Sequence, residues 1–415
     1  MPHHTHPSPP LHPGPEDAAA RAERARRAAR VEASLTAPGA PFAVVLGERG
    51  TPEYADGPRT LREFVETTWA YGEAPFLIAG ERTYSYGEFF AAASALAVRL
   101  RERHGLRSGD RAAIAMRNHP EWQIAFWAAQ LAGLVAVPLN AWWTEGEFGH
   151  ALDDCEPAVL LVDGERLGRV AGWARRTGTR VVLFHGAGCT AEGLRVERYE
   201  DFPAPDPLAA PPDVEPRPED DATILYTSGA TGRPRGAVAT QLAQVGAALN
   251  ARYHAAASAR ARGAIPGLEP APVSPMTVPF SDAAAFTGFY GAMAAGGTLD
   301  LIDGAAAAGG PTGYGLAETC GVVLAPFGDG RRAEPGGAGR PAPVTEARIA
   351  GPSGEELPDG EPGELWLRGQ SLFRGYWRDA AATGAAFADG GWFRTGDRAV
   401  RRDGWVSLVG RLKGA

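Results

Sequence analysis

Apolar residues recur along this chain at two different spacings, and each spacing predicts one kind of element. Phe89, Ala93 and Leu96 stand four and three positions apart, which predicts an amphipathic helix over residues 86–104. Residues 122–131 are apolar on nearly every side, so we expect a buried helix there. Short apolar or β-branched runs predict strands at residues 76–78, 82–84, 111–116, 134–139, 158–162, 180–184 and 223–226.

The order of these elements predicts the fold class. A strand at 111–116, a helix at 122–131 and a strand at 134–139 follow one another directly. This order favours a parallel sheet that helices cover on both faces. Asn118 can cap the helix. Beyond residue 345 the pattern changes to short β runs, so we predict an α/β protein with a small β-rich unit at its end.

The length of the chain allows several packed units. With 415 residues, 44% of them hydrophobic, it exceeds one typical domain. Residues 1–35 begin with a His- and Pro-rich stretch and continue with a charged Ala/Arg stretch. They predict a disordered extension, within which 16–33 could form a solvated helix. We predict a first α/β subdomain over 36–222, a second over 223–344 and the β-rich subdomain over 345–415.

Charge and cysteine content exclude several classes of protein. The formal net charge of -8 makes nucleic acid an unsuitable main partner. Three scattered cysteines fit neither a disulfide framework nor a zinc site and indicate the reducing cytoplasm. No apolar run reaches the length of a transmembrane segment. These properties indicate a soluble enzyme or binding protein that acts on small molecules.

The candidate chemistry begins at residues 226–236, where a predicted strand runs into a segment of hydroxyls, glycines and cations. Gly229, Gly232 and Gly236 let the backbone approach a ligand closely, and exposed N–H groups and hydroxyls can bond phosphate oxygens. The spacing differs from that of the Walker-type phosphate loop. The side chains that can bind phosphate here are those of Thr227, Ser228, Thr231 and Arg235.

Two later segments add polar residues in a fixed order. Residues 313–319 read Gly-Tyr-Gly-Leu-Ala-Glu-Thr, and 391–397 read Gly-Trp-Phe-Arg-Thr-Gly-Asp. As a carboxylate, Asp397 can accept both hydroxyls of a ribose, and Arg411 can donate to ribose or phosphate. Taken singly, each segment also has a structural interpretation, because Asp after Thr-Gly is commonly a turn residue.

Together these segments resemble the signature motifs of the adenylate-forming, AMP-binding superfamily, which includes acyl-CoA synthetases, luciferases and nonribosomal-peptide adenylation domains. Residues 226–236 are similar to its Tyr-Thr-Ser-Gly-Thr-Thr-Gly-x-Pro-Lys-Gly loop, and the later segments to its Tyr-Gly-x-Thr-Glu, Trp-Phe-x-Thr-Gly-Asp and Gly-Arg-x-Lys motifs. Residues 134–144 are similar to an early core motif and lean toward fatty-acyl-CoA synthetases; we expect Trp142 and Trp143 there to be scaffold.

The resemblance implies the superfamily's N-terminal domain, made of layered α/β subdomains with a β-rich subdomain. It also implies ATP and Mg²⁺ as cofactors and CoA as acceptor. The carried-over roles are catalysis by Thr231, Arg235 and Glu318, Mg²⁺ binding by Glu318, nucleotide binding by Thr227, Ser228, Gly229, Gly232, Tyr314, Gly315, Asp397 and Arg411, and a hinge at Lys413. Tyr314 would lie against the adenine.

The sequence departs from the superfamily in several places. Ala230 and Ala317 stand where the motifs carry hydroxyl residues, and Asp282 stands where relatives carry a histidine. The low-complexity segment 303–312 resembles a junction across an internal deletion, so we expect poor packing in the second subdomain. The chain also ends two residues beyond the hinge position, from which we expect the C-terminal lid domain to be absent.

Two functions are compatible with this sequence. The first is ATP-dependent activation of a carboxylic acid, with fatty acid favoured, to acyl-adenylate and then acyl-CoA, with little or no complete thioester formation by this chain. The second is a catalytically inactive ATP- or adenylate-binding protein, or a degenerate gene product. Completion of the enzyme by a separate polypeptide is a third possibility.

Overall fold

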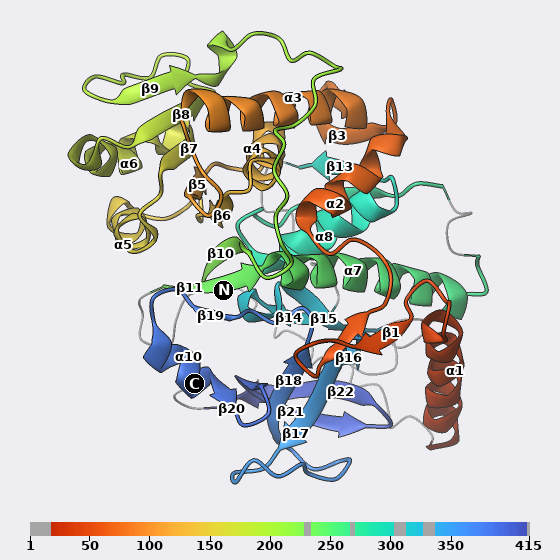
Figure 1. Ribbon diagram of the computed structural model, residues 1–415. Coiled ribbons are helices and arrows are strands. Elements are labelled where there is room, and N and C mark those ends of the chain that lie inside the picture. The colour runs from red at the N-terminus through yellow and green to blue at the C-terminus, as the bar shows by residue number, and fades with distance from the viewer. Residues whose placement is uncertain (1–17, 228–233, 266–269, 303–312, 327–336, 413–415) are drawn as a thin grey trace, which may run out of the picture.

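The computed structural model describes residues 18–227, 234–265, 270–302, 313–326 and 337–412 (Figure 1). Three sheets and the helices between them make up most of this structure, with a small hairpin of β1 (Val44–Leu46) and β2 (Pro52–Tyr54) beside them. Within the described ranges, no helix combines the length and apolarity needed to cross a membrane.

The first sheet has eight strands in the order β19-β11-β10-β6-β5-β7-β8-β9. Its strands are β5 (Arg111–Ala115), β6 (Val135–Pro138), β7 (Val159–Asp163), β8 (Arg180–Phe184), β9 (Arg195–Arg198), β10 (Asp221–Thr227), β11 (Arg235–Thr240) and β19 (Gly375–Tyr376). The strands from β10 to β9 are parallel, and β11 and β19 add antiparallel pairs. The predicted parallel sheet is confirmed.

Helices cover this sheet on both faces, because alternate strand residues enter two separate cores. Ile114 and Leu161 belong to the core under α3 (Tyr86–Val98) and α4 (Pro120–Leu131), whereas Leu160 and Val162 belong to the core under α5 and α6. The outer helices are α5 (Glu145–Cys155) and α6 (Gly164–Thr177). Capping fixes several helix starts: Ser85 and Glu88 form a capping box on α3, and Thr144 and Glu147 form one on α5.

The second sheet, in the order β12-β13-β3-β4, joins strands that lie far apart in the sequence. Its strands are β3 (Pro75–Ala79), β4 (Arg82–Ser85), β12 (Val273–Met276) and β13 (Thr298–Leu301). The predicted boundary between residues 222 and 223 is therefore wrong as a division between sheets. Strand β3, which lies before the boundary, pairs with β13, which lies after it. Strand β10, at the boundary, pairs with the earlier strand β6.

The third sheet is the predicted β-rich unit. Its strands are β14 (Tyr314–Leu316), β15 (Gly321–Ala325), β16 (Gly337–Pro341), β17 (Thr345–Ala350), β18 (Gly363–Gly369), β20 (Phe387–Ala388), β21 (Trp392–Arg402) and β22 (Trp405–Arg411). The order is β14-β15-β16-β22-β21-β18-β17, with β20 paired to β21. This sheet begins before residue 345, since β14 to β16 belong to it.

The remaining helical elements connect the sheets. They are α1 (Ala18–Thr36), α2 (Leu61–Glu66), α7 (Gln241–Ala261), α8 (Ala283–Ala294), α10 (Ala380–Ala386), the 3₁₀ turns η1 (Thr67–Tyr71), η3 (Tyr199–Asp201) and η4 (Ala317–Thr319), and the π turn η2 (Arg99–Arg103). Residues 18–36 form a helix, which the sequence allowed over 16–33 within the predicted disordered extension. Helix α1 forms there beside α7 and buries Ala28 and Leu35 (Figure 1).

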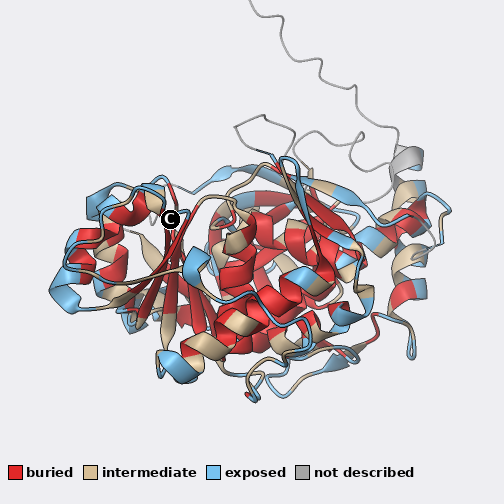
Figure 2. Ribbon diagram, turned by 90° about the horizontal axis from the view of Figure 1, so that it is seen from above, coloured by how far each residue is buried: buried red, intermediate tan, exposed pale blue. Residues whose placement is uncertain are grey.

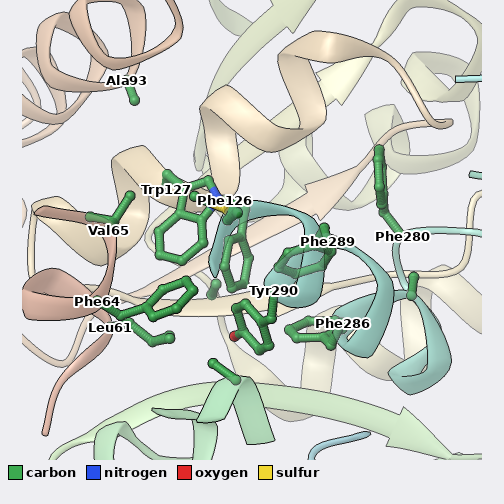
Figure 3. Close-up of a cluster of buried hydrophobic side chains, with 14 of the residues drawn as sticks. Leu61, Phe64, Val65, Ala93, Phe126, Trp127, Phe280, Phe286, Phe289 and Tyr290 are labelled. Carbon is green, nitrogen blue, oxygen red and sulfur yellow. The ribbon is translucent and has the colours of Figure 1, made fainter. Parts of the chain in front are cut away.

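The second subdomain packs better than the sequence predicts. Phe286, Phe289 and Tyr290 of α8 are fully buried. Figure 3 shows them meeting Phe64 of α2 and Trp127 of α4, and the rings of Phe64 and Trp127 stack with centroids 6.0 Å apart. Seen from above, buried residues run continuously through the central helices (Figure 2). The expected loss of packing is thus absent from the described part of this core.

Asn118 does not cap α4 as the sequence predicts. The N-cap is His119, without a capping side-chain bond. The Asn118 side chain instead donates to the carbonyl of Val278 and accepts from the N–H of Phe280, both at 2.8 Å. This amide therefore ties the first sheet to the segment that leads into α8.

Candidate active site

A large cavity of about 1260 Å³ lies where the carboxyl ends of β6 and β10 meet the third sheet. Such an edge of a parallel sheet is a common place for a ligand site. The cavity brings together residues from all three sequence motifs, which are separated by more than 70 residues at each step. Its lining includes Thr227, Arg235, Gly315, Ala317, Glu318, Thr395, Gly396 and Arg411.

Glu318 supplies a buried carboxylate at this cavity. It lies on η4 with 8% of its surface exposed, and its backbone carbonyl accepts from the N–H of Phe373 at 2.8 Å. The Tyr376 hydroxyl donates to its Oε1 at 2.8 Å. Burial raises the pKa of Glu318 above its usual value, because a carboxylate charge loses solvation there. A bound cation would favour the charged form and reverse this shift.

Tyr314 and Asp397 are joined directly. The Tyr314 hydroxyl donates to Asp397 Oδ2 at 2.7 Å, and Arg411 Nε lies 3.7 Å from Asp397 Oδ1. Asp397 and Arg411 also lie opposite each other in the ladder of β21 and β22. Burial raises the pKa of Tyr314, so this hydroxyl keeps its proton and remains a donor. The structure thereby brings three predicted nucleotide-binding residues to one place.

Glu364 is a site residue that the sequence motifs missed. It lines the cavity, accepts from the N–H of Gly396 at 3.0 Å and accepts from the indole of Trp366 at 2.8 Å. The first bond anchors the Thr395-Gly396-Asp397 segment of β21, and the second fixes the Glu364 carboxylate. The available signal was a charged residue within the short β runs predicted beyond residue 345, which gives no direct indication of its partner.

The ends of the phosphate-loop motif also reach this cavity. Thr227 and Arg235 lie opposite each other in β10 and β11 and line the cavity. The Arg235 guanidinium lies over the ring of Tyr376, 5.7 Å from its centroid, and 4.0 Å from Asp379. The predicted residues Ser228, Gly229, Thr231, Gly232 and Lys413, and the departure at Ala230, lie outside the described residues.

Of three other residues singled out from the sequence, two line the cavity: Trp143 and Asp282. Trp143 packs edge-on against Tyr226, with ring centroids 6.2 Å apart, as expected of a scaffold residue. It also forms part of the cavity lining. Trp142 is 62% exposed. Asp282 also lines the cavity, and its side chain accepts from the N–H of Ala284 at 2.8 Å as the N-cap of α8.

Comparison with known proteins identifies the family. The sequence model described as "AMP-binding enzyme" matches residues 64–311 and 309–377. The chain belongs to the AMP-binding enzyme family. It is therefore an AMP-forming acid–CoA ligase by family, as its motifs predict. The two matched pieces meet inside the segment 303–312, in agreement with the predicted internal deletion.

Its relatives include ligases for different acids. The chain is 30% identical to a feruloyl-CoA synthase of an Amycolatopsis species over 386 residues, covering 80% of this chain and 74% of that protein. It is 29% identical to the long-chain-fatty-acid–CoA ligase FadD13 of Mycobacterium tuberculosis over 363 residues, covering 74% of this chain and 70% of that protein. Acid activation to a CoA thioester is thus common to these relatives.

Solved structures confirm the fold. A putative long-chain-fatty-acid CoA ligase from Rhodopseudomonas palustris matches with a TM-score of 0.70 and 24% identity, covering 85% of this chain and 99% of that one. The N-terminal domain of FACL13 from Mycobacterium tuberculosis matches with a TM-score of 0.69 and 22% identity, covering 85% and 100%. The layered α/β architecture with its β-rich unit is that of the N-terminal domain of adenylate-forming enzymes.

Proposed function

We propose that this chain binds Mg·ATP in the large cavity and uses it to activate an apolar carboxylic acid. The observation that carries the proposal is the convergence of Glu318 and Arg411 on the cavity that the ends of β10 and β11 border, with the Tyr314–Asp397 pair next to Arg411. The proposed nucleotide-binding residues are Thr227, Ser228, Gly229, Gly232, Tyr314, Gly315, Asp397 and Arg411, with Thr231, Arg235 and Glu318 catalytic and Lys413 at the hinge.

The donor set fits Mg²⁺. Within the described residues, no group of three or more His, Cys, Asp or Glu is placed to hold a metal. Glu318 is instead a single buried carboxylate beside the proposed phosphate site, which suits an ion that takes one or two carboxylates and otherwise substrate phosphates and water. When bound, Mg²⁺ would neutralise charge on the phosphates. Glu318 would hold it there, with Tyr376 fixing one carboxylate oxygen.

The proposed reaction has two steps. A carboxylate oxygen of the acid attacks the α-phosphorus of ATP, and the bond to the pyrophosphate oxygen breaks, which gives acyl-adenylate and pyrophosphate. The CoA thiolate then attacks the acyl carbon, and AMP leaves. The described residues contribute positioning and charge, because Asp397 orients the ribose while Arg235 and Arg411 lie beside the phosphates.

The acid itself is proposed only by class. Early core motifs favour a fatty acid, and the relatives named above act on feruloyl and long-chain fatty acyl substrates, so we propose an apolar acid of aryl or alkyl type. Ala317 and Ala230 replace hydroxyl residues of the motifs, which supports weakened ATP turnover. The cytoplasm remains the proposed location, supported by three cysteines that form no disulfide.

Pyrophosphate exchange tests the first step. Purified chain is incubated with ATP, labelled pyrophosphate and either a feruloyl-type or a fatty acid. We expect acid-dependent exchange in the wild type, and its loss in Glu318→Gln. Glu346→Gln is the matched control, since Glu346 pairs with Arg368 away from the cavity. Absence of exchange with every acid, together with ATP binding by calorimetry, would instead support a catalytically inactive binding protein.

A degenerate product is distinguished by folding. Absence of both ATP binding and a cooperative unfolding transition would support it. CoA thioester formation is assayed separately by chromatography of the products, in the presence and absence of a purified C-terminal domain from a relative. Thioester that forms only on mixing would show completion by a second polypeptide.

A further inference from the structure

A second cavity lies at the opposite edge of the first sheet. Its volume is about 260 Å³. It adjoins Arg180 and Arg195, the first residues of β8 and β9, whereas the large cavity adjoins the last residues of β6 and β10. Figure 1 shows β8 and β9 at one end of the molecule beside α3. The lining residues are His104, Arg180, Val181, Leu194, Arg195, Val196 and Glu197.

A π-helical turn builds one polar wall of this cavity. Beyond α3 the backbone N–H of His104 donates to the carbonyl of Arg99 at 3.1 Å, which is the five-residue spacing of a π turn. In an α-helix, residues five apart lie on different sides. Because of the π turn, Arg99 and His104 reach the same Glu197 carboxylate. Arg99 Nε lies 2.6 Å from Oε2, and His104 Nε2 lies 3.2 Å from Oε1. The Glu197 charge is therefore already balanced by Arg99.

Arg180 and Arg195 add two positive charges to the cavity, and no carboxylate among the described residues pairs with either of them. Arg180 and Arg195 lie opposite each other in the parallel ladder of β8 and β9, so their side chains leave the same face of the sheet. No salt bridge in the described part of the chain involves either of them. With Glu197 balanced, the cavity wall carries two uncompensated positive charges.

We propose that this cavity binds a phosphate group, carried by inorganic phosphate or by a small phosphate monoester. Two guanidinium forks in register match the geometry and the charge of a phosphate dianion. The His104 side chain is 1% exposed and lines the cavity. Its Nε2 donates to Glu197, so Nδ1 is an acceptor, and it has no hydrogen-bond partner among the described residues; it suits the P–OH group of a hydrogen phosphate. Val181, Leu194 and Val196 give room for a small apolar substituent.

Titration of the full chain with inorganic phosphate at constant ionic strength, followed by calorimetry, tests this site. We expect Arg180→Gln and Arg195→Gln each to weaken phosphate binding roughly tenfold, the worth of one charge-assisted hydrogen bond. Arg107→Gln, at an exposed arginine outside the cavity, is the matched control and should bind as the wild type does. Glu197→Gln should bind phosphate more tightly, because it removes a like charge.

The proposed nucleotide site could also take phosphate, so Arg235→Gln, which removes a cation that lines that site, serves as a second background. Phosphate binding that is unchanged in Arg235→Gln and weakened in Arg180→Gln supports the second site. Binding that is weakened in Arg235→Gln but unchanged in Arg180→Gln overturns it and leaves the proposed function intact. An unchanged affinity in Arg195→Gln, or weaker binding in Glu197→Gln, also overturns the proposal. Thermal unfolding of each variant shows whether it is folded.

Discussion

His254 makes the stability of this protein depend on pH in a predictable direction. It lies on α7 with 9% of its surface exposed, and neither ring nitrogen has a hydrogen-bond partner among the described residues. Burial lowers the pKa of this imidazole to about 4. The ring is therefore neutral in the folded protein at pH values above about 4.

The sign and size of the effect follow from linkage. The folded pKa lies below the unfolded value of about 6.5, so the unfolded chain takes up a proton that the folded chain excludes as pH falls between them. Stability from this residue is complete above pH of about 6.5 and is lost progressively down to about 4. With about 1.4 kcal/mol for each pH unit, the loss amounts to about 3 kcal/mol.

Urea denaturation at pH 7, 6, 5 and 4.5 measures how the free energy of unfolding changes with pH in the wild type and in His254→Phe. We expect the variant to lose less stability on acidification, and to be at least as stable at pH 7, because an unpartnered polar ring has been replaced by an apolar one. His185→Gln is a control of opposite sign. Its bond to Glu121 at 2.9 Å raises the pKa of His185, so its contribution is greatest at low pH and is lost as pH rises.

Parallel loss of stability in the wild type and His254→Phe would refute this reasoning. It would show that the imidazole is either protonated in the folded protein or reached by water. Since carboxylates elsewhere titrate equally in both proteins, only the difference between the two curves is interpreted.

Three further substitutions test the site and the core. Glu364→Gln should raise the KM for ATP in pyrophosphate exchange roughly tenfold, because the amide oxygen cannot accept from both Gly396 and Trp366; an unchanged KM would show that these bonds do not position residues 395–397 of β21. Tyr314→Phe removes the hydroxyl that donates to Asp397, and calorimetry should show weaker ATP binding, with thermal stability nearly unchanged. Phe289→Ala should cost roughly 3–5 kcal/mol in urea denaturation; a loss below about 1 kcal/mol would contradict the packing described here.

Local patterns in the sequence predicted much of the fold, since the physics involved acts over a few residues. The 76–84 hairpin follows from two β-prone runs and Gly80, whose φ of 59° suits glycine at the turn. Helix α4 follows from a run that is apolar on every side, and all its residues but one are buried. The order of the three motifs also predicted the family, which the comparisons confirm.

The tertiary structure decided what depends on partners distant in the sequence. Asn118 looked like a cap because caps are local, yet it bonds Val278 and Phe280 in the distant segment between β12 and α8. Glu364 looked like a strand residue, and only its approach to Gly396 makes it part of the site. A hydrogen bond requires a few tenths of an ångström of placement, and such placement arises only when sheets from remote segments pack together. Spacing along a chain determines which face a side chain occupies, whereas packing determines what it meets there.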